Sequence, residues 1–210
     1  MFVKLEGRLV LMVGAGPVGE GKIESLLAAG ASVRVVSPQA TPRVREWARE
    51  GRIEWEAREY KPSDFAGAFL VIAATGSTAV HDEIYAEAKS RGVLCNAVDE
   101  PERCDFYFPA VVRRGDLQIA ISTGGLSPAL ASWLRDRLAA SCGPGLGDLA
   151  ALLAEARARL RSEGARSDAV DWVALLNGPL PALVRSGDLE DARAIVASAT
   201  TTSGQELPPS

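Results

Sequence analysis

Apolar runs alternate with amphipathic segments over the first hundred positions of the chain. The run at 69–74 is apolar throughout, as expected of a parallel strand that is covered on both faces. We predict strands at 9–13, 33–37, 53–57, 69–74 and 93–98. Helices are predicted between them: one ending at Ala29, one at 42–50 and one at 78–90. This alternation is typical of a doubly wound, mostly parallel α/β sheet.

The pattern changes after the fifth predicted strand. Strand-like runs at 106–112 and 117–122 flank a turn at 113–116, which predicts an antiparallel hairpin. Ser127 and Pro128 then suit the start of a helix that runs to about Ala140. The segment 143–145 should break it, and 148–197 is predicted to be helical with an interruption at 177–179.

Composition narrows the function classes. The chain has 210 residues, of which 47% are hydrophobic and 24% charged, which is ordinary for a globular protein. The net charge of -4 provides no general attraction to nucleic acid, and no apolar stretch approaches the roughly 18 residues of a membrane span. The N-terminus lacks a signal-peptide layout, and the three cysteines lack metal-ligand spacing. We therefore expect a cytoplasmic protein without a bound metal, nucleic acid or membrane partner.

The most informative motif is Gly-Ala-Gly-Pro-Val-Gly at 14–19. A predicted strand precedes it and a predicted helix follows it, and this context makes the motif a dinucleotide-binding fingerprint. Gly14 would allow the tight turn, Gly16 the approach of a pyrophosphate, and Gly19 close packing of helix against strand. The helix N-terminus would offer free N–H groups to the phosphates. The alternative is a glycine-rich turn that holds no ligand.

Polar residues follow two other strands at the same predicted edge. The second strand ends in Ser37, Pro38 and Gln39, without the carboxylate that usually binds the ribose of NAD. Ser37 and Gln39 could bond a ribose, whereas Arg43 could reach a 2′-phosphate, so this spacing leaves the choice of cofactor open. Thr75 follows the fourth strand and either faces the cofactor crevice or caps the next helix.

Asp99 follows the fifth strand, at the edge where ligands bind open α/β sheets. A carboxylate there could act as a general base, or it could start the turn before Pro101. His81 is the single histidine of the chain, and we interpret it as a packing or capping residue.

A second candidate anion site lies at the start of the later helix. Ser-Thr-Gly-Gly at 122–125 precedes Ser127 and is rich in hydroxyl groups and glycine. Three arginines could add positive charge: Arg113, Arg114 and Arg135. An ordinary capped helix with a flexible lead-in is the alternative.

Six segments in this order resemble one known family. They are Gly-Ala-Gly-Pro-Val-Gly-Glu-Gly-Lys at 14–22, Val-Val-Ser-Pro at 35–38, Ala-Ala-Thr at 73–75, Cys-Asn-Ala-Val-Asp at 95–99, Cys-Asp-Phe-Tyr-Phe-Pro-Ala at 104–110 and Ile-Ser-Thr-Gly-Gly-Leu-Ser-Pro-Ala-Leu-Ala at 121–131. Together they resemble the precorrin-2 dehydrogenase family, which includes the dehydrogenase and ferrochelatase part of siroheme synthase. The resemblance covers about residues 3–140 and is loose beyond 145.

The resemblance implies NAD-dependent oxidation of precorrin-2 to sirohydrochlorin by a homodimer, with Fe²⁺ or Co²⁺ as a further substrate wherever chelatase activity is present. Asp99 matches the family's catalytic aspartate, and Thr123 matches a hydroxyl position near the tetrapyrrole. Four residues match NAD contacts: Pro17, Val18, Pro38 and Gln39. We expect three more residues to contact the tetrapyrrole: Asn96, Gly124 and Ser127.

The expected organisation has four parts: an NAD-binding Rossmann domain at 1–112, a dimerisation and substrate-binding region at 113–145, a helical domain at 146–198 and a disordered tail at 199–210. Two departures from the family bear on the substrate, because Gly21 and His81 stand where relatives often have arginine and asparagine. Two other functions remain as alternatives: a nucleotide-sensing regulatory module, and a chelatase or tetrapyrrole carrier without redox activity.

Overall fold

The computed structural model describes residues 2–143 and 145–202. The chain forms two compact units, Met1–Tyr107 and Phe108–Ser210. We had expected the first boundary after residue 112, and the observed division lies five residues earlier. The predicted hairpin therefore belongs wholly to the second unit.

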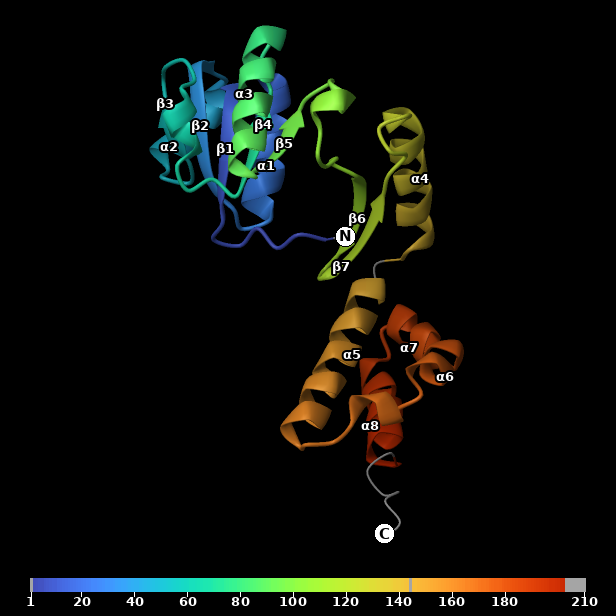
Figure 1. The fold of residues 1–210 in the computed structure, drawn as a ribbon. Coiled ribbons are helices and arrows are strands. Elements are labelled where there is room, and N and C mark those ends of the chain that lie inside the picture. The colour runs from blue at the N-terminus through green and yellow to red at the C-terminus, as the bar shows by residue number, and fades with distance from the viewer. Residues whose placement is uncertain (1, 144, 203–210) are drawn as a thin grey trace. The chain divides into compact units, whose positions relative to one another are not determined.

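The first unit alternates strands and helices in the predicted order (Figure 1). Its strands are β1 (Leu9–Ala15), β2 (Ser32–Ala40), β3 (Glu54–Glu56), β4 (Leu70–Ala73) and β5 (Leu94–Ala97). Its helices are α1 (Pro17–Ala28), α2 (Pro42–Arg49) and α3 (Thr78–Arg91), with two short 3₁₀ turns, η1 (Pro62–Phe65) and η2 (Pro101–Arg103).

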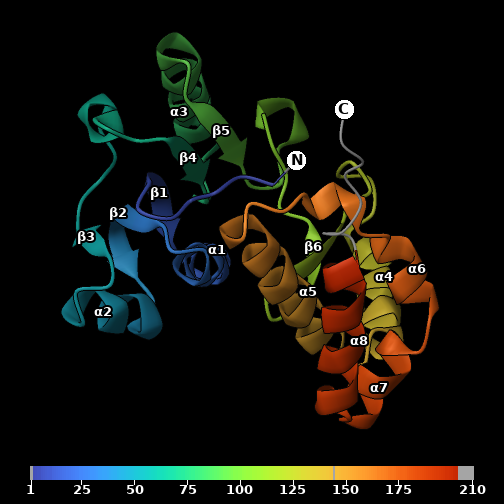
Figure 2. The same cartoon turned by 90° about the horizontal axis from the view of Figure 1, so that it is seen from below.

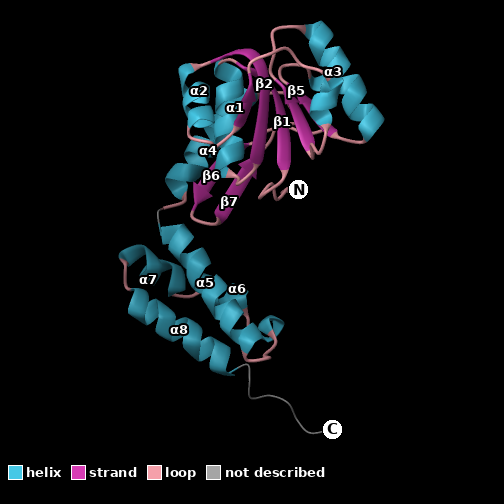
Figure 3. Cartoon of the chain, turned by 90° about the vertical axis from the view of Figure 1, so that its left-hand side faces the viewer, coloured by secondary structure: helices cyan, strands magenta, loops and turns pink. Residues whose placement is uncertain are grey.

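The five strands form one sheet in the order β3-β2-β1-β4-β5, and all neighbouring strands are parallel. Helices α1 and α2 cover one face, and α3 covers the other (Figures 2 and 3). The doubly wound sheet predicted from the sequence is thus confirmed. The chain reverses direction across the sheet between β1 and β4, and this reversal places the open edge for a ligand above these two strands.

Strand β2 extends three residues beyond its predicted end at Ser37. The register of β1 shifts between Val13 and Ala15, so that Ala15 pairs with Ala40. This irregularity lets Pro38 and Gln39 continue the strand while their side chains stay exposed. The extension depends on pairing with β1, which the local sequence of β2 does not reveal.

The second unit begins with the antiparallel strands β6 (Ala110–Arg114) and β7 (Leu117–Ile121). Their turn consists of Gly115 and Asp116 alone, because Arg114 pairs with Leu117. Helices follow as α4 (Pro128–Ser141), α5 (Gly145–Ser162), α6 (Trp172–Asn177), α7 (Leu180–Ser186) and α8 (Leu189–Thr202), with a 3₁₀ turn η3 (Ser167–Ala169) before α6. The predicted break at 143–145 is shorter, since Gly145 already begins α5.

The expectation of a disordered tail from residue 199 is wrong for its first four residues. Helix α8 continues to Thr202, and Thr200 is buried. The Thr200 hydroxyl accepts a hydrogen bond of 2.6 Å from Arg159 of α5. This contact, forty-one residues apart in sequence, holds the last turn of α8. Residues 203–210 lie outside the described part of the chain.

Asp64 anchors the connection between β3 and β4. Its side chain is only 5% exposed, and it accepts two hydrogen bonds from the Arg58 guanidinium, at 2.6 and 2.9 Å. It also accepts one from the Lys61 amide at 2.8 Å. Burial alone would raise the pKa of Asp64, but these bonds outweigh it and lower that pKa below its ordinary value.

We predict that Asp64→Asn destabilises the protein by about 1–3 kcal/mol at pH 7, because a buried guanidinium partner loses its charge-assisted bonds. The folded pKa of Asp64 lies below the unfolded one, so the carboxylate stabilises the fold above the unfolded value of about 3.9. That stabilisation is lost as the pH falls through the folded pKa. Urea denaturation should therefore show the gap between variant and wild type shrinking below about pH 4.

The matched control is Asp168→Asn, which removes an ion pair whose two partners are both exposed. It should leave the free energy of unfolding unchanged. An equal loss in the two variants, or a gap that does not depend on pH, would contradict the role given to Asp64.

Candidate functional site

The carboxyl ends of all five strands lie at one edge of the first unit because the sheet is parallel. The glycine loop follows β1, Thr75 lies two residues beyond β4, and Asp99 lies two residues beyond β5. Ser37, Pro38 and Gln39 lie in the last turn of β2. The sequence prediction that these residues share one edge is met by this arrangement of strands.

The glycine loop contains two close approaches of backbone to backbone. Gly14 has φ +102, and a Cβ there would overlap the carbonyl oxygen of Ala74 at the end of β4. A Cβ on Gly19 would lie 2.5 Å from the carbonyl oxygen of Gly14. These contacts press α1 and β1 against β4, so neither position accepts a side chain.

Gly16 has a different surrounding. A Cβ there would meet no atom within 4 Å, and Gly16, Pro17 and Val18 are exposed. Gly16 is the N-cap of α1, and no side chain caps the first amides of this helix. An open, uncapped helix start of 12 residues fits the pyrophosphate of a dinucleotide.

The end of β2 offers few free polar groups. The hydroxyl of Ser37 donates to the Gln39 carbonyl at 2.7 Å, and the Trp55 indole donates to the Ser37 carbonyl at 3.1 Å. Ser37 can therefore only accept a further hydrogen bond from a ribose. Gln39 is exposed and has no such commitment of its side chain among the hydrogen bonds of the described residues.

Arg43 is the cation that the sequence offered for a 2′-phosphate. It lies in the first turn of α2, where it pairs with Glu46 at 3.0 Å and stacks over Trp47 at 5.2 Å. Both contacts hold the guanidinium on α2. A phosphate that recruited Arg43 would have to replace the Glu46 carboxylate.

Thr75 and His81 form one unit at the end of β4. The Thr75 amide donates to Nε2 of His81 at 3.2 Å, and the Thr75 hydroxyl bonds within the turn to Ser77 at 3.3 Å. Ser77, not Thr75, is the N-cap of α3. His81 is 3% exposed, so the prediction of a packing residue is confirmed.

Asp99 has φ +63 and is the one non-glycine residue with positive φ in the described ranges. The Glu100 amide donates to the Ala97 carbonyl at 3.2 Å and closes a turn that has Asp99 at its third position. A left-handed aspartate costs about 1–2 kcal/mol, and Asp tolerates it better than most residues. Asp99 thus forms a turn before Pro101 while its carboxylate remains exposed at the ligand edge.

Glu100 and Arg103 extend this turn toward α3. Oε1 of Glu100 lies 3.1 Å from Nδ1 of His81, and Oε2 lies 3.0 Å from the Arg103 guanidinium. Neither approach has the alignment of a full hydrogen bond, so Nδ1 and Oε2 are buried with electrostatic contacts only. Arg103 also pairs with Asp82, at 2.6 Å.

Asn96 does not reach the substrate side, contrary to the sequence-based expectation. Its side chain is 6% exposed, and Nδ2 donates to the Phe106 carbonyl at 2.7 Å. Cys104 and Asp105 add further bonds from the same segment to Ala97 and Cys95. Asn96 therefore holds the chain after Asp99 against β5. Cys95 is fully buried, as its apolar neighbours predicted.

Lys22 brings a cation close to Asp99, which the sequence reading overlooked. It lies on α1, three residues after the buried Gly19 and four before the buried Leu26, and is partly buried itself. Burial lowers the pKa of the Lys22 ammonium, whereas the negative charge of Asp99 raises it. The helical spacing from Gly19 was the available signal.

The second candidate site lies in the second unit and is described separately. The Thr123 hydroxyl accepts from the Ser127 amide at 3.0 Å, and the Ser127 hydroxyl accepts from the Leu130 amide at 3.3 Å. Gly124 and Gly125 both have positive φ, so the loop needs glycine there. Both hydroxyls thus serve the start of α4, as in the capped-helix alternative.

The expectation that Arg114 adds charge to this loop is wrong. Its guanidinium donates to the carbonyls of Ala139 and Cys142, at the far end of the 14-residue helix α4. That helix is roughly 20 Å long. Arg135 pairs with Asp136 at 2.9 Å in the middle of the same helix.

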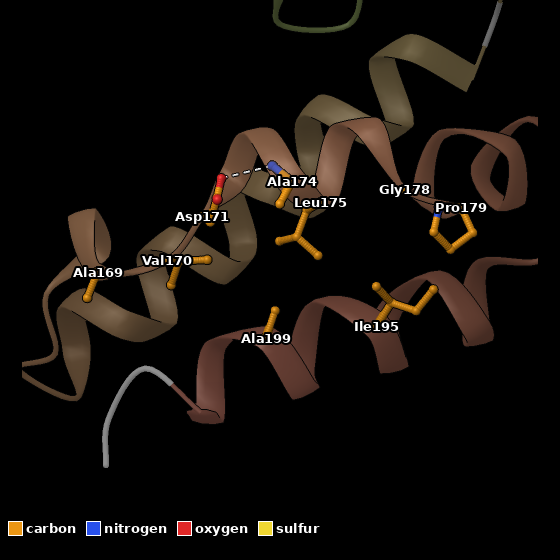
Figure 4. A pocket seen from close by; sticks show the side chains of 9 residues that line it. All are labelled: Ala169, Val170, Asp171, Ala174, Leu175, Gly178, Pro179, Ile195 and Ala199. Atoms are coloured by element: carbon orange, nitrogen blue, oxygen red, sulfur yellow. Dashed lines mark hydrogen bonds between the residues drawn. The ribbon is translucent and has the colours of Figure 1, made fainter. Parts of the chain in front are cut away.

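A pocket of about 440 Å³ lies between α6, α7 and α8 (Figure 4). It is lined by Ala169, Val170, Asp171, Ala174, Leu175, Gly178, Pro179, Ile195 and Ala199. The Asp171 carboxylate already accepts from the Ala174 amide at 2.9 Å as the N-cap of α6. The pocket therefore results from the packing of short helices, and we assign no ligand to it.

Two further searches concern the described residues only. They contain no cluster of three or more His, Cys, Asp or Glu side chains that could hold a metal ion. In the same residues, the helices are too short or too polar to cross a bilayer.

Comparison with known proteins agrees with this geometry. A family model described as "Putative NAD(P)-binding" matches residues 1–110, more than half of the chain. The chain belongs to this NAD(P)-binding family. A second model, "Sirohaem biosynthesis protein central", matches residues 114–141, the region that contains Thr123 and α4. The resemblance drawn from the six motifs is thereby confirmed.

Curated members of the family include siroheme synthases. The chain is 36% identical to siroheme synthase of Photorhabdus laumondii over 194 residues, which cover 91% of this chain and 41% of the relative. It is 39% identical to siroheme synthase 1 of Yersinia enterocolitica over 196 residues, with coverages of 91% and 41%. The chain thus spans about two fifths of the length of these relatives.

A solved structure titled "SirC, precorrin-2 dehydrogenase" has the same fold. Its TM-score is 0.75 at 23% identity, and the match covers 96% of this chain and 98% of the other. Because both lengths match almost completely, the Rossmann-like unit, the hairpin and the later helices occur together in that protein as well.

Proposed function

We propose that this protein oxidises precorrin-2 to sirohydrochlorin with NAD as the hydride acceptor. The observation that carries the proposal is the Asp99 carboxylate, which is exposed at the same sheet edge as an uncapped dinucleotide loop. The siroheme synthase relatives and the name of the structural neighbour support the choice of substrate.

The chain's own residues would divide the work between cofactor and substrate. The amides at the start of α1 would bind the pyrophosphate, with Gly16 leaving room for it. Pro38 and Gln39 would lie against the ribose, and Thr75 would face the crevice between the two. When bound, NAD supplies the acceptor for the hydride that precorrin-2 loses.

Asp99 would take the proton that leaves precorrin-2 together with the hydride. The carboxylate is accessible to solvent, and Lys22 provides positive charge in its vicinity. Thr123 and the glycine loop before α4 would contact the carboxylates of the tetrapyrrole. Insertion of Fe²⁺ or Co²⁺ into the product would also need a base, and Asp99 is the group we assign to it.

We predict that Asp99→Asn lowers NADH production with precorrin-2 by about a hundredfold or more, the usual scale for losing a general base. Asparagine keeps the size of the side chain and tolerates the left-handed turn, so folding and NAD affinity should stay unchanged. Initial rates and a fluorescence titration with NAD measure the two effects. Near-normal turnover would reduce Asp99 to a turn residue, and Thr123→Ala should instead act mainly on the KM for precorrin-2.

We infer that NAD is preferred over NADP, because Arg43 is engaged by Glu46 and Trp47. Gly16→Asp should abolish NAD binding while the fold persists, since the new carboxylate enters open space but repels the pyrophosphate. Gly14→Ala should fail differently, by destabilising the protein, because its Cβ has no room beside Ala74. Calorimetric titration and thermal melting separate these losses. Tighter binding of NADP, or unchanged NAD affinity in Gly16→Asp, would refute the assignment.

We further propose that the protein is a homodimer in the cytoplasm. Helix α4 and the loop before it carry an exposed apolar stripe, with Leu126 91% exposed and Trp133 54% exposed. Leu130 lies between them at helical spacing. Such a stripe is typical of a surface that a second copy covers. The free cysteines suit a reducing compartment.

We predict that Trp133→Glu converts a dimer into a monomer, because a charge replaces the largest side chain of the stripe. Light scattering at micromolar concentration measures the change in mass. Val173→Glu is the matched control, since Val173 is an exposed apolar residue on α6 and should leave the dimer intact. A monomeric wild-type protein would refute the proposal.

A further inference from the structure

His81 lies between the two turns to which the proposed function assigns different tasks. Its Nε2 accepts a hydrogen bond from the amide of Thr75, on the cofactor side. Its Nδ1 faces the carboxylate of Glu100, the residue directly after Asp99. One buried imidazole thus contacts the ends of both β4 and β5.

The surroundings of the ring determine its tautomer. Nε2 accepts a bond from an N–H group and so carries no proton. Nδ1 lies 3.1 Å from a carboxylate oxygen, and a lone pair at that distance would be repelled. The ring is therefore neutral with its proton on Nδ1. This arrangement gives each nitrogen a separate and directional task.

We propose that His81 is a positioning residue that holds the Thr75 turn and the Asp99 turn in register through its two ring nitrogens. This inference rests on the proposed function for the meaning of the two turns. Arg103 supports it from the other side, since its guanidinium contacts both Glu100 and Asp82 of α3. Asp99 has no internal bond in the described residues that would by itself hold its left-handed conformation; the closure of its turn depends on the Glu100 backbone.

Two substitutions separate the tasks of the ring. The amide of asparagine occupies the place of Nδ1, so His81→Asn keeps a donor toward Glu100 and loses the acceptor for Thr75. The amide of glutamine reaches the place of Nε2, so His81→Gln keeps the acceptor and loses the donor. We expect His81→Asn to weaken NAD binding about two- to tenfold with a smaller change in kcat. We expect His81→Gln to lower kcat by a similar factor, with the Kd for NAD changed less than about twofold.

A third variant covers the case in which either substitution at this buried position prevents folding. Glu100→Gln keeps the shape of the side chain and removes its charge, so kcat should fall while the Kd for NAD stays unchanged. The matched control is Glu87→Gln on the later part of α3, which pairs with Arg91 and should change neither quantity. Equal changes of kcat and Kd in the two His81 variants, or no change in either, would overturn the proposal.

The tautomer itself is measurable without substrate or cofactor. His81 is the single histidine of the chain, so long-range ¹H–¹⁵N correlation spectra of the labelled protein report this ring alone. We expect the Nδ1–H form. An Nε2–H form, or the averaged signals of a freely exchanging ring, would refute the proposal even if the protein oxidises precorrin-2. Absence of turnover in the wild type, with the expected tautomer and the expected change in NAD affinity, would instead refute only the proposed function.

Discussion

The contact between Gly14 and the end of β4 is the constraint on which the first unit depends. The backbone of the glycine loop passes so close to Ala74 that no side chain fits between them, and Gly19 packs just as closely on Gly14. These contacts are made by main-chain atoms of two neighbouring parallel strands. They fix the start of α1 at the reversal point of the sheet, where its amides face outward rather than into the core. The loop is therefore narrow where it packs and open at Gly16, where a ligand would approach.

The turns beyond β4 and β5 are built on this edge by longer-range contacts. His81 comes from α3, Glu100 from the chain after β5, and Arg103 from η2, yet all three meet beside Thr75 and Asp99. The exposed carboxylate of Asp99 is thus supported by charged groups that lie behind it rather than by bonds of its own. Such support leaves both carboxylate oxygens available to a substrate. It also places the energetic cost of a left-handed aspartate on neighbours that are buried and rigid.

The sequence predicted the elements well wherever local signals and tertiary packing agree. Apolar runs located every strand of the parallel sheet, and the glycine motif located the turn between β1 and α1. The errors have long-range causes. The bond from Arg159 to Thr200 carries α8 past its predicted end, and the contact of Arg114 with the end of α4 removes it from the loop before that helix. Asn96 follows an apolar run like a site residue, but the carbonyl of Phe106, ten positions away, takes its amide.

The end of β2 shows how a site can depart from the common fingerprint without losing its shape. No carboxylate stands there, and the Ser37 hydroxyl is turned inward to the Gln39 carbonyl. The strand compensates by continuing to Ala40, where it pairs with Ala15 directly after the bulge at Gly14. This pairing joins the β2 end to the same glycine loop that packs on β4. The position of Pro38 and Gln39 therefore follows from backbone pairing, and a ribose would be recognised by the shape of this extended edge and by one neutral amide. Because a neutral amide does not repel phosphate as a carboxylate would, discrimination against NADP would rest on the Glu46 carboxylate that holds Arg43.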